Sequence, residues 1–106
     1  MKTLTGLTLE EAVRKLASRN KRVVGVYHFG SKEQQKLASP FSDVDLAVVL
    51  WPYDKYVAAD VALCLPSKFD VTILNEAPAF IIAAVVNHGK LLYCRDQQTL
   101  SSAMMR

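Results

Sequence analysis

Three aspartates lie on segments that otherwise have the apolar composition of buried strands. Asp43 and Asp45 come just before and at the start of the apolar run Leu46–Leu50, and Asp70 lies near the start of the run Phe69–Leu74. Because successive strand side chains alternate between faces, Asp43 and Asp45 are expected to point the same way. Three carboxylates beside a dry core repel one another and are costly to desolvate unless a cation lies among them. The pattern therefore predicts a magnesium site of the kind used for phosphoryl and nucleotidyl transfer.

A glycine-serine pair ends the preceding apolar run. The segment Arg22–Phe29 is rich in Val and Tyr, as expected for a central strand, and Gly30 and Ser31 follow it. Glycine lets a backbone approach a phosphate closely, and Ser31 with amides at the start of a short predicted helix, Ser31–Leu37, offers donors to phosphate oxygens. If Arg22–Phe29 and Leu46–Leu50 are neighbouring strands, this turn and the aspartates meet at one edge of the sheet.

Each of these parts also has a purely structural interpretation. Asp43 follows Ser42 and could cap a turn, and Asp70 could be a strand-edge residue in an ion pair. A lone Gly-Ser pair carries almost no information. The combination of a strand, Gly-Ser, an Asp-x-Asp strand, a helix and a strand with Asp is much more specific, and it favours a site for metal and nucleotide.

Bulk properties limit the alternatives. The 106 residues suit a single domain, 1–106, with 51% hydrophobic and 22% charged residues, as in ordinary globular proteins. The net charge of +3 arises from 13 basic against 10 acidic residues without a long like-charge block, so nucleic-acid binding is not expected. The local basic cluster is interpreted as a solvated face. It contains Arg14, Lys15, Arg19, Lys21 and Arg22.

Cysteine content and hydropathy indicate a cytoplasmic protein. Cys64 and Cys94 match neither a zinc signature nor a disulfide framework, and they are interpreted as reduced core residues. The N-terminal segment lacks the apolar region of a signal peptide. No uncharged apolar run reaches the roughly 18 residues that a membrane span needs.

The remaining elements follow from periodicity and from capping signals. Thr8 and Glu11 form a predicted capping box at the start of the first helix. The predicted elements are helices over Thr8–Asn20, Tyr53–Leu65, Ala77–Asn87 and Gln97–Arg106, and a strand over Lys90–Cys94. Together they predict an α/β (α+β) domain in which a small mixed sheet of about four strands is flanked by helices.

The predicted helix Ala77–Asn87 is apolar nearly all round. It carries Phe80, Ile81, Ile82, Val85 and Val86. A helix without a polar face is either enclosed or covered by another subunit. In so small a domain this favours a partner interface, with another protein or with a second copy of the chain.

Two short motifs and the strand after them resemble a known family. Phe29-Gly30-Ser31, Ser42-Asp43-Val44-Asp45-Leu46 and Phe69-Asp70-Val71 resemble the signature of the minimal nucleotidyltransferases, the smallest members of the DNA polymerase β superfamily. The segments Leu74-Asn75-Glu76-Ala77-Pro78 and Gly89-Lys90-Leu91-Leu92-Tyr93 are also similar to later segments of that family, so the resemblance covers nearly the whole chain. It implies a polymerase β-like nucleotidyltransferase fold.

The resemblance also implies roles and a partner. Asp43 and Asp45 would bind two magnesium ions and Asp70 would be the third carboxylate, while Gly30, Ser31 and Lys32 would hold the phosphates of ATP. Such proteins are usually encoded beside a HEPN-domain toxin and act as its antitoxin. Some do so by moving AMP from ATP onto a toxin tyrosine, which makes the enzyme a protein adenylyltransferase.

One departure from the family pattern leaves two hypotheses open. Gln35 stands where the family usually has a second glycine, which weakens the expectation of tight nucleotide binding. The chain is therefore either an active nucleotidyltransferase or an antitoxin that neutralises its partner by binding alone. A receiver-type signalling domain fits poorly, because its acidic pair should follow the first strand directly. Phosphate-loop and dinucleotide-binding motifs do not occur in the sequence.

Overall fold

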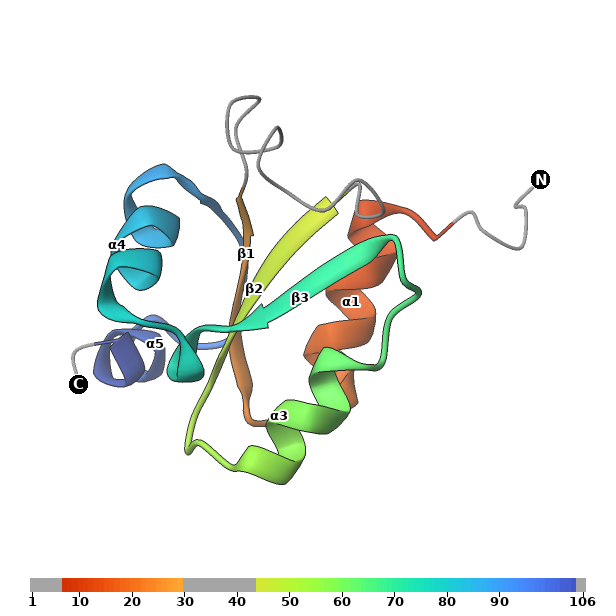
Figure 1. Cartoon of the computed structure of the whole chain (residues 1–106). Coiled ribbons are helices and arrows are strands. Elements are labelled where there is room, and N and C mark those ends of the chain that lie inside the picture. Colours follow the sequence, from red (N-terminus) through yellow and green to blue (C-terminus); the bar gives the residue numbers. More distant parts are fainter. Residues whose placement is uncertain (1–6, 30–43, 105–106) are drawn as a thin grey trace.

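A mixed sheet with helices on both faces forms the protein (Figure 1). The computed structural model describes residues 7–29 and 44–104, and in these residues the strand order is β3-β2-β1-β4. β1 lies antiparallel to β2 and β4, whereas β2 and β3 are parallel. The strands are β1 Val23–Phe29, β2 Val44–Leu50, β3 Phe69–Ile73 and β4 Lys90–Cys94. The helices are α1 Leu9–Arg19, α3 Lys55–Ala62, α4 Ala79–His88 and α5 Gln97–Met104, with a 3-10 turn, η1, at Leu74–Glu76.

The predicted mixed α/β architecture is thus confirmed. The first helix shows why the sequence indicated its start clearly. The Thr8 hydroxyl accepts a hydrogen bond from the Glu11 amide at 3.1 Å, and the Glu11 carboxylate accepts one from the Thr8 amide at 2.9 Å. This is the predicted capping box, and α1 begins directly after it. One side of α1 is then buried against the sheet through Ala12, Val13 and Leu16.

Two apolar layers hold the sheet between the helices. α1 and α3 cover one face, and we call this layer the α1/α3 core; it includes Leu16, Val26, Leu46, Val48, Val61, Phe69 and Ile73. α4 and α5 cover the other face, and the α4/α5 core includes Val24, Tyr27, Ala47, Val49, Leu74, Val85 and Leu100. Alternate residues of β2 contribute to opposite layers, so both faces of this central strand are dry.

Element boundaries differ from prediction where capping or pairing decides them. β2 begins at Val44 rather than Leu46, so Asp45 lies inside the strand. α3 is shorter than the predicted Tyr53–Leu65, because the Asp54 carboxylate accepts hydrogen bonds from the Tyr56 and Val57 amides and fixes the helix start at Lys55. The predicted helix Ser31–Leu37 lies outside the described residues.

Asn75 completes the sheet where β3 ends. Its side-chain oxygen accepts a hydrogen bond from the Leu50 amide at 2.8 Å, and its side-chain nitrogen donates to the Leu50 carbonyl at 2.8 Å. The pairing of β3 with β2 stops at Ile73 opposite Val48. Beyond that point the Asn75 side chain takes the place of a β3 residue in pairing with β2. It satisfies the backbone groups of Leu50, which need partners when buried.

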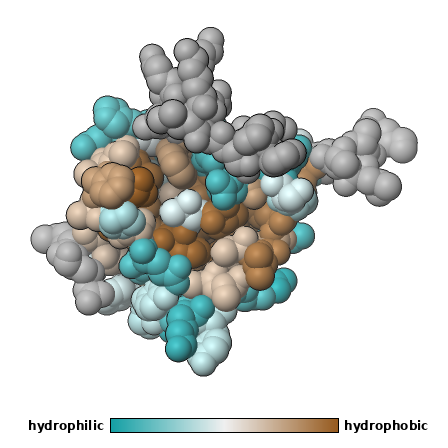
Figure 2. Space-filling view, viewed as in Figure 1, coloured by the Kyte–Doolittle hydropathy of each residue, from teal (hydrophilic) through white to brown (hydrophobic). Residues whose placement is uncertain are grey.

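Helix α4 buries only part of its apolar surface. Val85 is buried, whereas Phe80 is 72% exposed and Val86 46% exposed. Apolar residues gather on the surface where α4 lies (Figure 2).

Across the described ranges 7–29 and 44–104, no helix has the length and apolar character to cross a membrane. Cys64 and Cys94 are free and half-buried.

Candidate functional site

Asp45 and Asp70 lie side by side on adjacent parallel strands. The register pairs Asp45 of β2 with Asp70 of β3. Ala47 and Val49, which share a strand face with Asp45, pack into the α4/α5 core, while Phe69 and Val71 on either side of Asp70 pack against the α1/α3 core. Both carboxylates therefore project on the α4/α5 side of the sheet. Since neighbouring strands are about 4.8 Å apart, the two side chains are direct neighbours, as expected if β3 lies alongside β2.

The electrostatics of this pair disfavour two bare negative charges. Partial burial raises the pKa of Asp45, the charge of Asp70 raises it further, and His28 opposes both effects. Asp45 is half-buried, whereas Asp70 is exposed to solvent. Folding thus holds a carboxylate where its ionised form is costly, and a bound cation would remove that cost.

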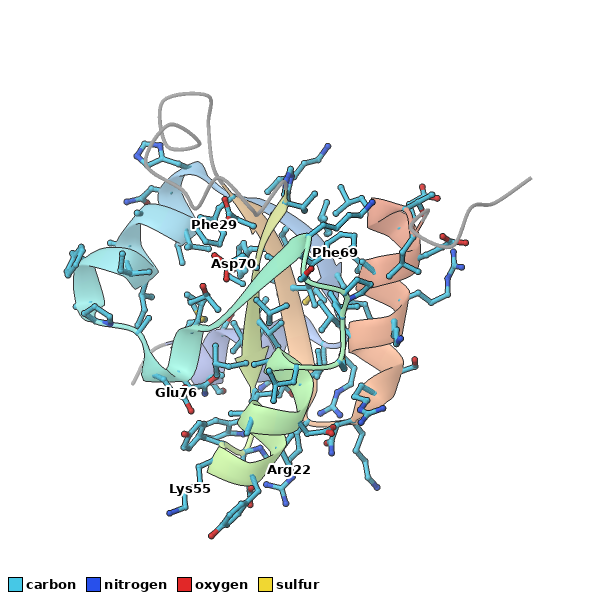
Figure 3. All side chains as sticks on the ribbon, turned by 45° about the vertical axis from the view of Figure 1, so that its right-hand side comes forward. Arg22, Phe29, Lys55, Phe69, Asp70 and Glu76 are labelled. Carbon is cyan, nitrogen blue, oxygen red and sulfur yellow. The ribbon has the colours of Figure 1, made fainter. Side chains whose placement is uncertain are left out.

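Phe29 flanks Asp45 on the opposite side from Asp70. The antiparallel register of β1 and β2 pairs Phe29 with Asp45, and Phe29 packs against the α4/α5 core. Figure 3 shows Phe29 and Asp70 at the same end of the sheet, far from Arg22 and Lys55. Phe29 was not predicted as a site residue. Its position directly before Gly30 was the available signal, but its place beside Asp45 depends on a register that only the structure provides.

The other predicted site residues adjoin this pair along the chain. Gly30, Ser31 and Lys32 follow Phe29, and Asp43 precedes Val44, the first residue of β2. These four residues and Gln35 lie outside the described residues. Within the described part of the chain, no group of three or more acidic, histidine or cysteine side chains is arranged to hold a metal ion. Asp45 and Asp70 are brought together, and the predicted third ligand is Asp43.

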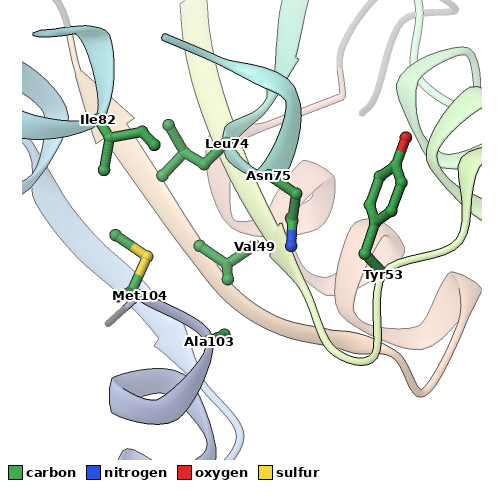
Figure 4. A pocket seen from close by; sticks show the side chains of 7 residues that line it. All are labelled: Val49, Tyr53, Leu74, Asn75, Ile82, Ala103 and Met104. Carbon is green, nitrogen blue, oxygen red and sulfur yellow. The ribbon is translucent and has the colours of Figure 1, made fainter. Parts of the chain in front are cut away.

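A separate cavity lies toward the other end of β2 and is not part of this site (Figure 4). Its volume is about 160 Å³, and its lining consists of Val49, Tyr53, Leu74, Asn75, Ile82, Ala103 and Met104. Val49 is four residues beyond Asp45, or about 13 Å along the strand. The Tyr53 hydroxyl at the rim donates a hydrogen bond to Glu76, and this contact raises the pKa of Tyr53. Both polar and apolar side chains line the cavity, and neither Asp45 nor Asp70 is among them.

Comparison with known proteins agrees with this geometry. The family model for polymerase beta nucleotidyltransferases matches residues 11–98. No curated protein matches the chain significantly.

Several solved structures are similar over most of the chain. A chain from a toxin-antitoxin complex crystallised with AMP-PNP is 27% identical, with a TM-score of 0.62, covering 92% of this chain and 83% of that one. A chain from the MntA-HepT toxin-antitoxin complex is 26% identical, with a TM-score of 0.57 and coverages of 91% and 79%. A chain from the Shewanella oneidensis complex of a tri-AMPylated HEPN toxin with its MNT antitoxin is 26% identical, with a TM-score of 0.58 and coverages of 91% and 77%.

These matches confirm the resemblance that the short motifs indicated. The family match includes β1, β2 and β3, and with them both aligned carboxylates. The sheet order and the flanking helices supply the fold that the resemblance implied. The chain therefore belongs to the polymerase beta nucleotidyltransferase family.

Proposed function

We propose that this protein is a magnesium-dependent nucleotidyltransferase that acts as an MNT-type antitoxin. The proposed reaction moves AMP from ATP to a hydroxyl group, a tyrosine side chain of a HEPN-type toxin. The observation that carries the proposal is the alignment of Asp45 with Asp70, beside the strand that leads into Gly30 and Ser31. The similar complexes, one crystallised with AMP-PNP and one containing a tri-AMPylated HEPN toxin, support the choice of ATP and of the partner.

The side chains present fit magnesium. Carboxylate oxygens are the ligands that Mg²⁺ prefers, and it is usually held by one or two carboxylates together with substrate phosphates. The pKa of Asp45 is raised by burial and by Asp70, which is the arrangement that a cation relieves. Asp43, Asp45 and Asp70 would be the protein ligands. When bound, the two ions would neutralise charge on the phosphates and make the acceptor hydroxyl more acidic.

The nucleotide phosphates are assigned to the turn after β1. Gly30 would allow the backbone to approach the phosphates, and the Ser31 hydroxyl and the charged Lys32 would bind their oxygens. β1 ends at Phe29, opposite Asp45, so Gly30 follows in the sequence directly after a residue that pairs with a carboxylate. The chain thereby links phosphate binding and metal binding through one pair of neighbouring strands.

Asp70 is the proposed proton acceptor. The acceptor oxygen attacks the α-phosphorus and forms a new O–P bond, while the bond to the β-phosphate oxygen breaks and pyrophosphate leaves. Asp70 is exposed at the start of β3, where an incoming hydroxyl can reach it. Its carboxylate takes the hydroxyl proton as the new bond forms.

Label transfer tests this proposal. The protein is incubated with ATP labelled at the α-phosphate, magnesium and the product of its neighbouring gene, and label on that product is measured. We expect transfer by the wild type and none by the double variant Asp43→Asn/Asp45→Asn. Asp60→Asn is the matched control, because Asp60 pairs with Arg19 between α1 and α3, away from the site. Absence of transfer by the wild type, or equal transfer by the double variant, would contradict the proposal.

A second candidate function, neutralisation by binding alone, is favoured by the exposed surface of α4. Phe80 and Val86 expose apolar area that a partner protein would cover. This is the helix predicted over Ala77–Asn87 as the toxin contact, and the structure places it at Ala79–His88. In this second function, contact through α4 would silence the toxin without any nucleotide transfer.

Two variants separate the two functions. The double variant Asp43→Asn/Asp45→Asn should lose protection against the toxin if transfer is required, and full protection would favour binding alone. Phe80→Asp should weaken the complex with the toxin in either case, measured by pull-down of purified proteins. Leu63→Asp is the control, because Leu63 is 82% exposed at the end of α3, on the opposite side of the sheet. Equal effects of Phe80→Asp and Leu63→Asp on toxin binding would show that α4 is not the contact surface.

A further inference from the structure

A row of three side chains crosses the sheet at the proposed site. Phe29 of β1 pairs with Asp45 of β2, which pairs with Asp70 of β3. Phe29 packs with the α4/α5 core, the same side of the sheet on which the two carboxylates project. Paired residues on one sheet face have Cβ atoms about 4.5–5.5 Å apart, so Asp45 has a carboxylate on one side and an aromatic side chain on the other.

Gly89 allows the end of α4 to approach the other side of Phe29 closely. A Cβ atom at Gly89 would lie 3.4 Å from the Phe29 Cβ, 3.3 Å from the His28 carbonyl oxygen and 2.5 Å from the Val85 carbonyl oxygen. The last distance is shorter than real contacts allow, and both oxygens belong to the backbone. The backbone of Gly89 has φ −82° and ψ 167°, which other residues also adopt, so glycine is needed here for space.

We infer that Phe29 is a positioning residue that keeps the Asp45 carboxylate directed toward Asp70. This inference rests on the proposed function. Like charges push Asp45 and Asp70 apart, so without a cation the Asp45 side chain gains by turning away toward β1. The Phe29 side chain fills the space into which Asp45 would turn. The end of α4 at Gly89 lies against Phe29 on the side away from Asp45 and holds it in place. The carboxylates are thus arranged for a divalent cation before the cation arrives, which is the preorganisation that supporting residues give to a site.

Metal binding tests this role directly. The affinity for Mn²⁺, measured by electron paramagnetic resonance in the presence of AMP-PNP, needs no turnover and no toxin. Phe29→Val keeps a strand-forming residue but shortens the side chain, and we expect about tenfold weaker Mn²⁺ binding, the lower end of the effect of removing a supporting residue. Phe29→Leu, which keeps most of the bulk, should bind Mn²⁺ nearly as the wild type does.

A second variant tests the support of Phe29 by the end of α4. Gly89→Ala places a methyl group against the Val85 carbonyl, so the last turn of α4 must move and its support of Phe29 is reduced. We expect this variant to weaken Mn²⁺ binding as well. Gly25→Ala is the matched control, because the three atoms nearest to its methyl group would all belong to the Leu100 side chain, and the closest of them lies at its flexible end.

The outcomes distinguish this inference from the proposed function. If Asp45→Asn binds Mn²⁺ as the wild type does, the metal site and therefore the proposed function are wrong. If Asp45→Asn loses binding while folded Phe29→Val and Gly89→Ala retain wild-type affinity, only the positioning role is overturned. Should Phe29→Val fail to fold, as judged by circular dichroism, the comparison of Gly89→Ala with Gly25→Ala decides the same question.

Discussion

The aspartates at the two ends of the sheet have opposite surroundings. Beyond the end of β2, Asp54 accepts hydrogen bonds from the Val57 and Tyr56 amides at the start of α3, and these bonds lower its pKa. Beyond the end of β4, Asp96 accepts hydrogen bonds from the Thr99 hydroxyl and the Thr99 amide at the start of α5, and these bonds lower its pKa. At the other end, burial and the charge of Asp70 raise the pKa of Asp45. Asp54 and Asp96 stabilise the fold in their ionised form, whereas ionisation of Asp45 is costly. Carboxylates that oppose folding are the ones that binding or catalysis must explain.

The largest effect expected from this contrast is on catalysis. Asp70→Asn removes the proposed proton acceptor and should lower kcat for AMP transfer by about 10²- to 10⁴-fold. The folded state should survive the change, because Asp70 is exposed. Steady-state transfer assays and thermal melts of the same preparations measure both quantities. A fully active Asp70→Asn variant would show that the carboxylates at this end of the sheet are not needed for catalysis, and would contradict the contrast between the two ends.

At the far end of the sheet the expected effect is on stability. Asn75→Ala leaves the amide and the carbonyl of Leu50 without their side-chain partner, and it should lower the free energy of unfolding by about 1–3 kcal/mol. Urea unfolding measures the change. Asn87→Ala is the control, because Asn87 is exposed near the end of α4. Similar losses for the two variants would mean that the Asn75 contacts contribute little.

The pH dependence of stability should have opposite signs at the two ends. The raised pKa of Asp45 gives a contribution that is fully present below its unfolded pKa of about 3.9 and is lost as the pH rises through the folded value. The lowered pKa of Asp96 gives a contribution present above that unfolded value and lost as the pH falls through the folded one. In metal-free buffer, Asp45→Asn should therefore gain thermal stability relative to the wild type as the pH rises above about 4.

Asp96→Asn should show the reverse trend at lower pH: it should lose stability relative to the wild type as the pH rises toward about 4, measured by circular dichroism melts. Adding magnesium with AMP-PNP should raise the melting temperature of the wild type but not that of Asp45→Asn, since only a bound cation offsets the cost of ionised Asp45. Parallel pH profiles for the two variants would contradict the contrast between the two ends.

The smallest effect is expected for the ion pair of Arg19 and Asp60. The two side chains are 45% and 47% exposed, and the guanidinium donates hydrogen bonds of 2.6 and 2.7 Å to the carboxylate. Exposed ion pairs add little to stability. Asp60→Asn should therefore melt close to the wild type, which also qualifies it as a control in the transfer assay. A large loss would indicate that the contact between α1 and α3 depends on this pair.

Much of the fold followed from local signals. The capping box at Thr8 and Glu11 and the strand Lys90–Cys94 were predicted correctly, because each depends on residues near in sequence. The alternation of side chains along a strand predicted that Asp43 and Asp45 point the same way, and that Asp70 could join them if its strand lay alongside; the structure pairs Asp45 with Asp70. The roles of Gly30, Ser31, Lys32 and Asp43 stay predictions.

Features that depend on long-range register were not predictable. The pairing of Asn75 with Leu50 joins residues 25 positions apart, and a lone asparagine after a strand does not indicate it. The place of Phe29 beside Asp45 needs the exact pairing of β1 with β2. Helix α4 was apolar enough to suggest full enclosure or a partner, but only the structure shows that Phe80 faces outward.

The parallel pairing of β2 with β3 limits how this chain can vary in length. Side chains alternate along a strand, so a one-residue slip of β3 would turn Asp70 to the face of the sheet opposite Asp45. Insertions between α3 and β3, in the stretch 63–68, leave that alternation intact. Deletion of a single residue inside β3 would separate the two carboxylates even if the sheet still formed. A change in strand register should therefore affect the proposed activity more than it affects stability.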